Sequence, residues 1–523
     1  MRRATSVVGW LVVVLVGVGI LGLVYGFSLY PRLHAGQRVV DNLTPAFTPE
    51  AAAGDRAGIN FLSDAVNTLD PIVTPKGGAA SEVPKLVSFV SKRTGLTQTQ
   101  VLTTLQQKFP HTTALLQTLP LSSVNEEVPG LVQFLATTLK TSPDNVLATL
   151  KQNFPAIHQA VTALPTVTQG WNAVPGTEKL TRFSTEQPVR SAPEIRSYYS
   201  SDVVPVVERN TTNMAQLHDW WPKVDSFPLI LTVVGALAAG LGVVMLVFSL
   251  MVKRGRGVKM TAWAAVFVVG AAVFGLVFGA GLFARLGGAG HLVDDAAPVF
   301  TDARIAGDKA SIGFVSSVVD LADPIVLTEG GAAAEVPKLV AFVSRQTGLS
   351  QAAVLSTLQQ KFPHTTALLQ AIPLSEVTAE LPRLVAFLST ALKATPEQVN
   401  AALGQNFPHL AQAITYLPKV TEGWKNVPGT TAGSPMHTAV GVRDYFGKAV
   451  VPALAANQAD FNELNGHWPP LILVTPLLGA ISVVVMLWAG IFFCACWGVG
   501  RWRYGPGLYE VPGEAERVPA HLG

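Results

Sequence analysis

Four long stretches of the chain are apolar and contain no charged side chain: 7–29, 227–252, 260–284 and 471–497. Each reaches or exceeds the roughly 20 residues that a helix needs to cross a hydrocarbon core about 30 Å thick. The pattern therefore predicts four transmembrane helices. A secretory signal is the alternative for the first stretch, but its apolar run is longer than the usual ~7–15 residues and no small-x-small cleavage motif follows it. We expect it to remain as an anchor.

Lysine and arginine gather beside the ends of these stretches, at 2–3, at 253–259 and at 501–503. Basic residues next to membrane helices remain on the cytoplasmic side. Both termini are thus expected in the cytoplasm, and the two long segments 31–226 and 285–469 are expected on the outer face of the plasma membrane.

The two long segments contain a sequence repeat that occurs four times. Within each segment the copies start 45 residues apart, and between segments corresponding copies start 253 residues apart. Repetition at such a period indicates an architecture built from one supersecondary unit. The four copies span 82–120, 127–165, 335–373 and 380–418.

Each repeat has the pattern of three short amphipathic helices. In the first copy apolar residues recur at i, i+3, i+4 and i+7 from Val83, with Pro84 at the expected start and Gly95 at the expected end. Thr97 is expected to cap the second helix, and Pro110 to separate it from the third. About 40 residues rarely bury a sufficient core alone, so we expect the two repeats of one segment to pack on each other. Candidate core residues are Phe89, Phe109, Phe134, Phe154, Phe342, Phe362, Phe387 and Phe407.

The duplication includes the membrane helices. Gly17, Gly22 and Gly26 of the first apolar stretch stand 253 residues before glycines of the third. The chain therefore reads as an all-α membrane protein in which one helix–domain–helix unit was doubled. Because that unit crosses the membrane twice, the halves should be related by a pseudo-twofold axis along the membrane normal.

Small residues four positions apart suggest close helix packing in lipid. The spacing occurs at Gly22 and Gly26 and again in the third stretch, and it predicts a seam between the first and third helices. Glycine is also simply frequent in membrane helices, which is the alternative explanation. The candidate packing residues are Gly22, Gly26, Gly275, Gly279, Gly235 and Ala239.

Several positions next to the apolar stretches mark element boundaries. Pro45 and Pro298 are expected to stop helices that extend out of the membrane. Asp55 and Asp308 precede apolar periodic runs, so we expect them to be helix N-caps. The expected division of the chain is 1–30 (cytoplasmic N-terminus and first span), 31–226 (first helical domain), 227–252 (second span), 253–259 (basic loop), 260–284 (third span), 285–469 (second helical domain), 470–498 (fourth span) and 499–523 (cytoplasmic tail).

The halves differ most after Trp171 and Trp424, where proline, glycine, serine and threonine predict a loop and the alignment then resumes with a shift of six residues. Variable loops often carry partner contacts. The aromatic residues Trp220, Trp221 and Trp468 that follow are expected at the membrane interface.

Composition supports the membrane assignment and indicates the class of organism. Hydrophobic residues make up 49% and charged residues 14% of the 523 residues, and the net charge of +3 gives no case for nucleic acid. The only cysteines, Cys494 and Cys496, lie in the fourth apolar stretch, so the large external segments lack disulfides, as is ordinary in bacteria. Together with the Ala, Val, Gly and Thr bias, the arrangement resembles four-span membrane proteins of actinobacteria with duplicated extracytoplasmic helical domains. That resemblance implies a class of organism and no activity.

Few residues suggest chemistry. His111, His364 and His409 follow prolines in Phe-Pro-His, but no Asp, Glu or Cys stands at ligand spacing, so helix N-termini are favoured over a metal site. Cys494 and Cys496 cannot complete a tetrahedral metal site and are read as small apolar filling, with a redox pair as the alternative. The Gly-Gly pairs of the linkers lack the Gly-Lys-Ser/Thr of a phosphate loop. No cofactor, metal or enzyme activity is expected.

Three functions are compatible with the pattern. The first is a membrane scaffold or accessory subunit whose helical modules bind lipids or other envelope proteins, because repeat surface is extensive and the membrane stretches lack ionisable residues. The second is a component that handles lipids or other apolar solutes, since short amphipathic helices can enclose an acyl chain. The third is a sensor that acts through a partner, because the tail after 498 is too short for an output domain.

Overall fold

The computed structural model describes residues 2–74, 78–219, 223–251, 256–279, 281–326, 331–466 and 473–503. Every regular element among these residues is a helix, with one isolated β-bridge between Thr181 and Pro188. The described contacts divide the chain into two compact units. The membrane unit comprises Met1–Asp41, Gln216–Asp294 and Asp460–Gly523, and the lobed unit comprises Asn42–Ala215 and Asp295–Ala459.

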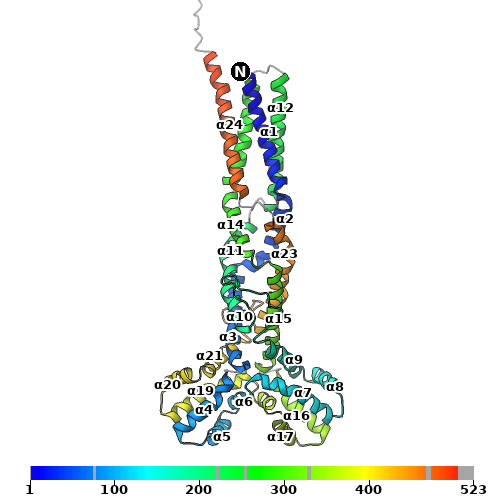
Figure 1. Cartoon of the computed structure of the whole chain (residues 1–523), viewed down its shortest axis with the longest axis vertical. Coiled ribbons are helices and arrows are strands. Elements are labelled where there is room, and N and C mark those ends of the chain that lie inside the picture. Colours follow the sequence, from blue (N-terminus) through cyan, green and yellow to red (C-terminus); the bar gives the residue numbers. More distant parts are fainter. Residues whose placement is uncertain are drawn as a thin grey trace, which may run out of the picture. The chain divides into compact units, whose positions relative to one another are not determined.

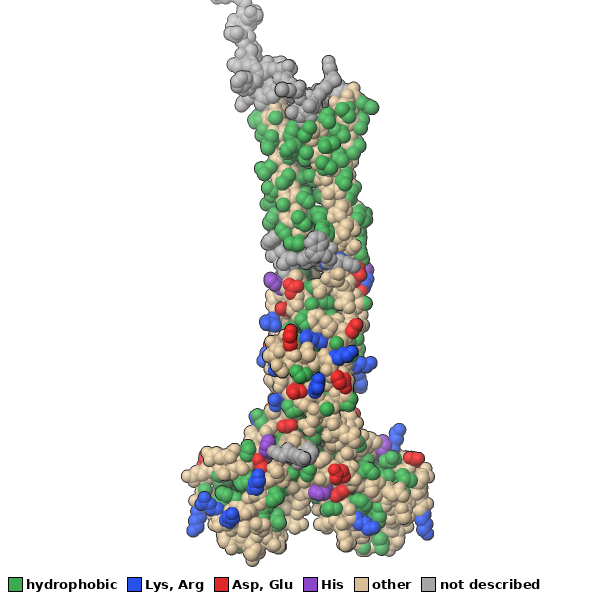
Figure 2. Space-filling view, in the orientation of Figure 1, with side chains coloured by type: hydrophobic (Ala, Val, Ile, Leu, Met, Phe, Trp, Pro, Cys, Tyr) green, Lys and Arg blue, Asp and Glu red, His purple; other side chains and the backbone are tan. Residues whose placement is uncertain are grey.

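Four helices of the membrane unit are long and apolar enough to cross a bilayer, as the sequence predicts. Their qualifying windows are Ser6–Gly26, Val224–Met251, Lys259–Gly279 and Val474–Trp497. Hydrophobic side chains cover these helices, whereas charged side chains gather on the rest of the chain (Figure 2). The helices are α1 (Arg2–Gly26), α12 (Phe227–Met251), α13 (Arg256–Phe274), which continues as the π-helical turn η4 (Gly275–Gly279), and α24 (Val474–Arg503).

The expected seam through Gly22, Gly26, Gly275 and Gly279 is not present. A Cβ built at any of these four would meet no described atom within 4 Å. Close packing occurs instead between α1 and α12, where a Cβ at Gly17 would lie 2.4 Å from the backbone nitrogen of Ala239 and 2.7 Å from the carbonyl oxygen of Gly235. The helices pair in chain order, α1 with α12 and α13 with α24. Spacing alone could not show which face of each helix meets its neighbour.

The lobed unit is built on two long helices, α3 (Pro49–Val73) and α15 (Asp302–Val326). Helix α3 packs on α21 and α15 packs on α9, so each long helix lies against a helix from the other half of the sequence. The other short elements of the lobed unit are η1 (Thr44–Phe47), α10 (Ala192–Tyr198), η2 (Tyr199–Val203), α22 (Ala439–Asp444) and η5 (Tyr445–Val450). The boundaries between the two units fall inside α2 (Leu29–Leu43), α11 (Val204–His218), α14 (Leu282–Ala296) and α23 (Val451–Asn465), and η3 (Val224–Ser226) belongs to the membrane unit.

The twelve remaining helices form two lobes (Figure 1). Each lobe takes one sequence repeat from each half, which differs from the expectation that repeats of one segment pack together as separate domains. One continuous core joins both segments. The first lobe contains α4 (Ala79–Thr94), α5 (Gln98–Lys108), α6 (Pro110–Thr118), α19 (Leu374–Leu392), α20 (Pro396–Asn406) and α21 (Pro408–Gly423). The second contains α7 (Leu121–Thr138), α8 (Pro143–Asn153), α9 (Pro155–Gly170), α16 (Ala332–Thr347), α17 (Gln351–Lys361) and α18 (Pro363–Ala371).

Within the lobes, capping residues close in the sequence predict several helix ends. Gly95 ends α4 in the left-handed conformation (φ 75°), and Thr97 caps α5 through a capping box with Gln100. The expected start at Pro84 is wrong, because α4 begins five residues earlier and Pro84 lies inside it. The third helix of the second repeat likewise continues through Pro165. A proline inside a helix removes one backbone hydrogen bond, and both helices continue in spite of this loss.

Asp55 and Asp308 are not N-caps. Thr48 caps α3 by accepting a hydrogen bond from the amide of Ala51, and Pro49 occupies the first turn, so the helix begins before Asp55. Asp308 lies six residues into α15. Both aspartates are buried. The helix stop near Pro45 is confirmed, since α2 ends at Leu43. The tryptophans expected at the membrane interface, Trp220, Trp221 and Trp468, lie outside the described residues.

Candidate functional site

Four glutamates, each at the first position of a sequence repeat, connect the halves of the lobed unit. The carboxylate of Glu380 accepts hydrogen bonds from the backbone amides of His111 (3.3 Å) and Thr112 (2.8 Å), at the N-terminus of α6. In return, the carboxylate of Glu82 accepts from the amides of His409 and Leu410, at the N-terminus of α21. These contacts satisfy amides that have no partner within their own helix and place a negative charge at the positive helix end.

The second lobe has the same exchange. The carboxylate of Glu127 accepts from the amides of His364 and Thr365, and that of Glu335 accepts from the amides of Ala156 and Ile157. Glu82, Glu335 and Glu380 are buried and Glu127 is half-buried. Each lobe is therefore held by two carboxylates that cap helices of the opposite half.

The eight candidate core phenylalanines also make contacts between the two halves of the sequence. They form four aromatic pairs with ring centroids 5.7–6.0 Å apart, and each pair joins the two halves of the sequence. Such tilted or edge-on pairs stabilise beyond the area they bury. The pairs are Phe89 with Phe407, Phe109 with Phe387, Phe134 with Phe362 and Phe154 with Phe342.

Asp308 is the most deeply buried ionisable group of α15. The hydroxyl of Tyr199 donates to its Oδ1 at 3.2 Å, and Tyr198 and Arg304 lie close enough to influence its titration. Burial raises the pKa of the Asp308 carboxyl to about 7, against the opposing hydrogen bond of Tyr199 and the charge of Arg304. Tyr199 opens the π-helical turn η2. π-Helical turns are rare in proteins, and those that occur are often found at functional sites.

Asp55 has an equivalent environment in α3. Burial raises its pKa to about 7, and Tyr445 provides the opposing hydrogen bond. Tyr445 opens the second such turn, η5. The Oδ1 atom of Asp55 is buried and has no hydrogen-bond partner in the described part of the chain. Both carboxyls therefore face tyrosines from the opposite half.

An apolar cavity lies between α3 and α15. The space inside it that is open to water-sized molecules is about 60 Å³. Its walls come from α3, α10, α15, α19 and α21, and nearly all lining side chains are hydrophobic, such as Phe61, Ile195, Phe314, Val318 and Leu417. A second apolar cavity lies inside the second lobe, between α7, α16, α17 and α18.

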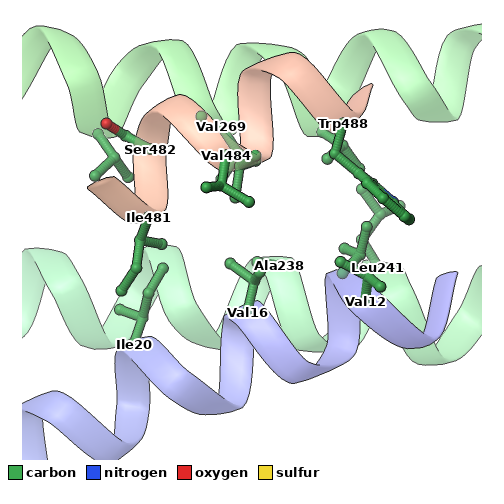
Figure 3. A pocket seen from close by; sticks show the side chains of 15 residues that line it. Val12, Val16, Ile20, Ala238, Leu241, Val269, Ile481, Ser482, Val484 and Trp488 are labelled. Atoms are coloured by element: carbon green, nitrogen blue, oxygen red, sulfur yellow. The ribbon is translucent and has the colours of Figure 1, made fainter. Parts of the chain in front are cut away.

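The membrane unit has its own apolar space at the centre of the four helices. Figure 3 shows Val12, Val16, Ala238 and Val484 among the side chains around it. Ser482 and Trp488 provide the polar atoms of this lining, and no lining side chain is ionisable. Nearer one end, a stack of Trp10, Trp263 and Phe492 joins α1, α13 and α24, with ring centroids 4.2 and 4.7 Å apart.

The histidines take the position that the sequence favoured. Each of His111, His364 and His409 lies just inside a helix that begins with proline, and Nδ1 of His111 contacts the carbonyl oxygen of Gln370 at 3.0 Å. Within the described residues no group of three or more His, Cys, Asp or Glu side chains is placed to hold a metal. The thiol-bearing residue Cys494 is exposed on α24.

No protein family, no curated protein and no solved structure matches the chain.

Sequence reasoning missed the glutamate caps and the buried aspartates, although both had a signal. A glutamate at the same position of all four repeats was visible as a pattern, but its partners lie roughly 180–330 residues away in the sequence. The aspartates follow a glycine in both halves, which resembles a cap signal. Only the fold reveals that tyrosines cover them.

Proposed function

We propose that the protein is a non-enzymatic scaffold or accessory subunit of the bacterial cell envelope, anchored by its four apolar helices, whose lobed unit binds other envelope proteins or lipids. The observation that carries the proposal is the exchange of glutamate caps, which within each lobe ties a repeat of one half to a repeat of the other half. Both termini are proposed to be cytoplasmic and both long segments external, from the positions of the basic residues.

We further propose that the halves arose by duplication and are related by a pseudo-twofold axis. Matched contacts support this. The indole nitrogen of Trp171 donates to Asp70 at 2.8 Å, and that of Trp424 donates to Asp323 at the same distance. Each tryptophan and each aspartate stands 253 residues from its counterpart.

Exposed leucines on the lobes are the proposed contact points. Leu96 and Leu102 are 39% and 38% exposed in the first lobe, and Leu349 and Leu355 are 47% and 38% exposed in the second. Large apolar side chains that are exposed together mark surfaces used in binding. Their presence on both lobes supports a partner that engages apolar helix surface.

The combined change Leu96→Ser and Leu349→Ser should release a partner without unfolding the protein. We expect the amount of partner recovered by affinity purification in mild detergent to fall about tenfold, because two exposed apolar contacts are lost. The thermal midpoint should stay within error. Gln106→Ser with Gln359→Ser, equally exposed on α5 and α17, is the matched control. Purification of the wild-type protein alone in several detergents would remove the proposal.

The apolar cavities favour a second function, the handling of lipids or other apolar solutes within an envelope transport complex. The cavity between α3 and α15 is lined almost wholly by hydrophobic side chains, which is the kind of lining that apolar ligands need.

Native mass spectrometry of the purified protein tests the second function. We expect a co-purified lipid that survives removal of the detergent micelle. Val318→Trp, which places a large ring in the cavity, should abolish it, whereas Val233→Trp on the exposed face of α12 should not. Spectra that show only the bare protein, under conditions that retain annular lipids on the four helices, would contradict it.

A further inference from the structure

Two arginines at matching positions of the halves have opposite surroundings. Arg443, on α22, donates from Nη1 to Asp320 at 2.5 Å and from Nε to Asp444 at 2.8 Å, so two carboxylates neutralise it. Its counterpart is Arg196, on α10, since the alignment that follows the six-residue shift pairs Ile195-Arg196 with Val442-Arg443.

The carboxylates around Arg443 are absent around Arg196. Asp320 stands 253 residues after Asn67, and the position of Asp444 corresponds to Ser197. The guanidinium of Arg196 donates to the amide oxygen of Asn67, a neutral acceptor. Among the ion pairs formed by described residues, none includes Arg196. The sequence thus retains the cation and replaces both counter-ions.

Arg196 is half-buried, and the apolar part of its side chain contributes to the wall of the cavity between α3 and α15. A half-buried guanidinium without a counter-ion can be compensated by a carboxylate or phosphate of a ligand through paired hydrogen bonds. The remaining lining, including Leu69, Ile195 and Val315, suits a hydrocarbon chain.

We propose that this cavity binds an anionic amphiphile with an apolar chain, the chain between α3 and α15 and the acidic head group on Arg196. The inference rests on the second proposed function and adds the charge of the ligand and the residue that recognises it. Arg443 has no such role because Asp320 and Asp444 already occupy its donors.

The test uses the purified full-length protein and three fluorescent probes, namely a long-chain fatty acid, its methyl ester and a lysophosphatidate. We expect the wild-type protein to bind the acids at least about tenfold more tightly than the ester, because a charge-assisted contact is lost in the ester. Arg196→Gln should remove that preference and leave binding of the ester unchanged. The two acids distinguish a carboxylate ligand from a phosphate ligand.

Two further variants separate recognition from structure. Asn67→Asp supplies the missing counter-ion, so it should weaken binding of both acids while it preserves the thermal midpoint. Arg443→Gln, the matched control, should leave the preference for acids intact. Equal binding of acid and ester, or equal losses in Arg196→Gln and Arg443→Gln, would overturn this inference alone. Failure of all three probes to bind would overturn the second proposed function as well.

Discussion

Replacing Glu380 by glutamine should expose two amides, 268 and 269 residues away in the sequence. The carboxylate accepts from the amides of His111 and Thr112, and glutamine offers one oxygen and places an amide NH₂ against the second donor. A buried donor left without a partner, together with the loss of charge at a helix N-terminus, costs about 2–4 kcal/mol. Hydrogen exchange followed by mass spectrometry should show faster exchange at the start of α6, and the thermal midpoint should fall by several degrees.

Glu376 provides the control for that experiment, since it lies on the same helix, α19, and is exposed. Glu376→Gln should change neither α6 exchange nor the thermal midpoint. Exchange that increases only within α19 in Glu380→Gln would show that the two halves are not joined through this carboxylate.

Asp308→Asn should stabilise the lobed unit above neutral pH and have a smaller effect in acid. The folded-state pKa of about 7 lies above the ordinary value of 3.8, so the folded state binds the proton more tightly than the unfolded state. Stability is then fully present below about pH 4 and is lost as the pH rises toward 7. Between pH 5 and pH 8 the loss is about 2–3 kcal/mol for this carboxyl. Asparagine keeps an oxygen for the Tyr199 hydroxyl and carries no charge.

Thermal midpoints at pH 5 and pH 8 measure this effect. The wild-type protein should lose several degrees on going from pH 5 to pH 8, and Asp308→Asn should lose clearly less. Asp302→Asn is the control because Asp302 lies exposed at the start of the same helix. A pH response of Asp308→Asn identical to that of the wild-type protein would mean that Asp308 is ionised in the folded state throughout this range.

The glutamates and the aspartates of the lobed unit affect its stability in opposite ways when they are ionised. The glutamates are acceptors at helix ends, where a negative charge is stabilised by backbone amides. The aspartates are buried inside helices against tyrosines, where a negative charge is destabilised by desolvation. A lobed unit that is stabilised by the glutamates and destabilised by ionisation of the aspartates should be most stable under mildly acidic conditions.

The sequence by itself determined the elements whose causes are local. Charge-free stretches longer than a bilayer is thick predicted the four apolar helices, and the structure contains four helices of that length and composition. The left-handed Gly95 and the capping box of Thr97 were predictable because their partners lie within a few residues. The three-helix pattern within 82–120 was predictable for the same reason.

Only the tertiary structure decided which surfaces meet. The four repeats present similar apolar faces, so periodicity alone could not distinguish pairing within a half from the observed pairing across halves. Gly22 and Gly26 had the spacing of a packing motif, yet the close approach occurs at Gly17, because helix rotation depends on all neighbouring side chains. Asp55 resembled a cap until Tyr445, nearly 400 residues later, was seen to cover it. Contacts between distant segments arise from the whole packed chain, and a local pattern contains no information on them.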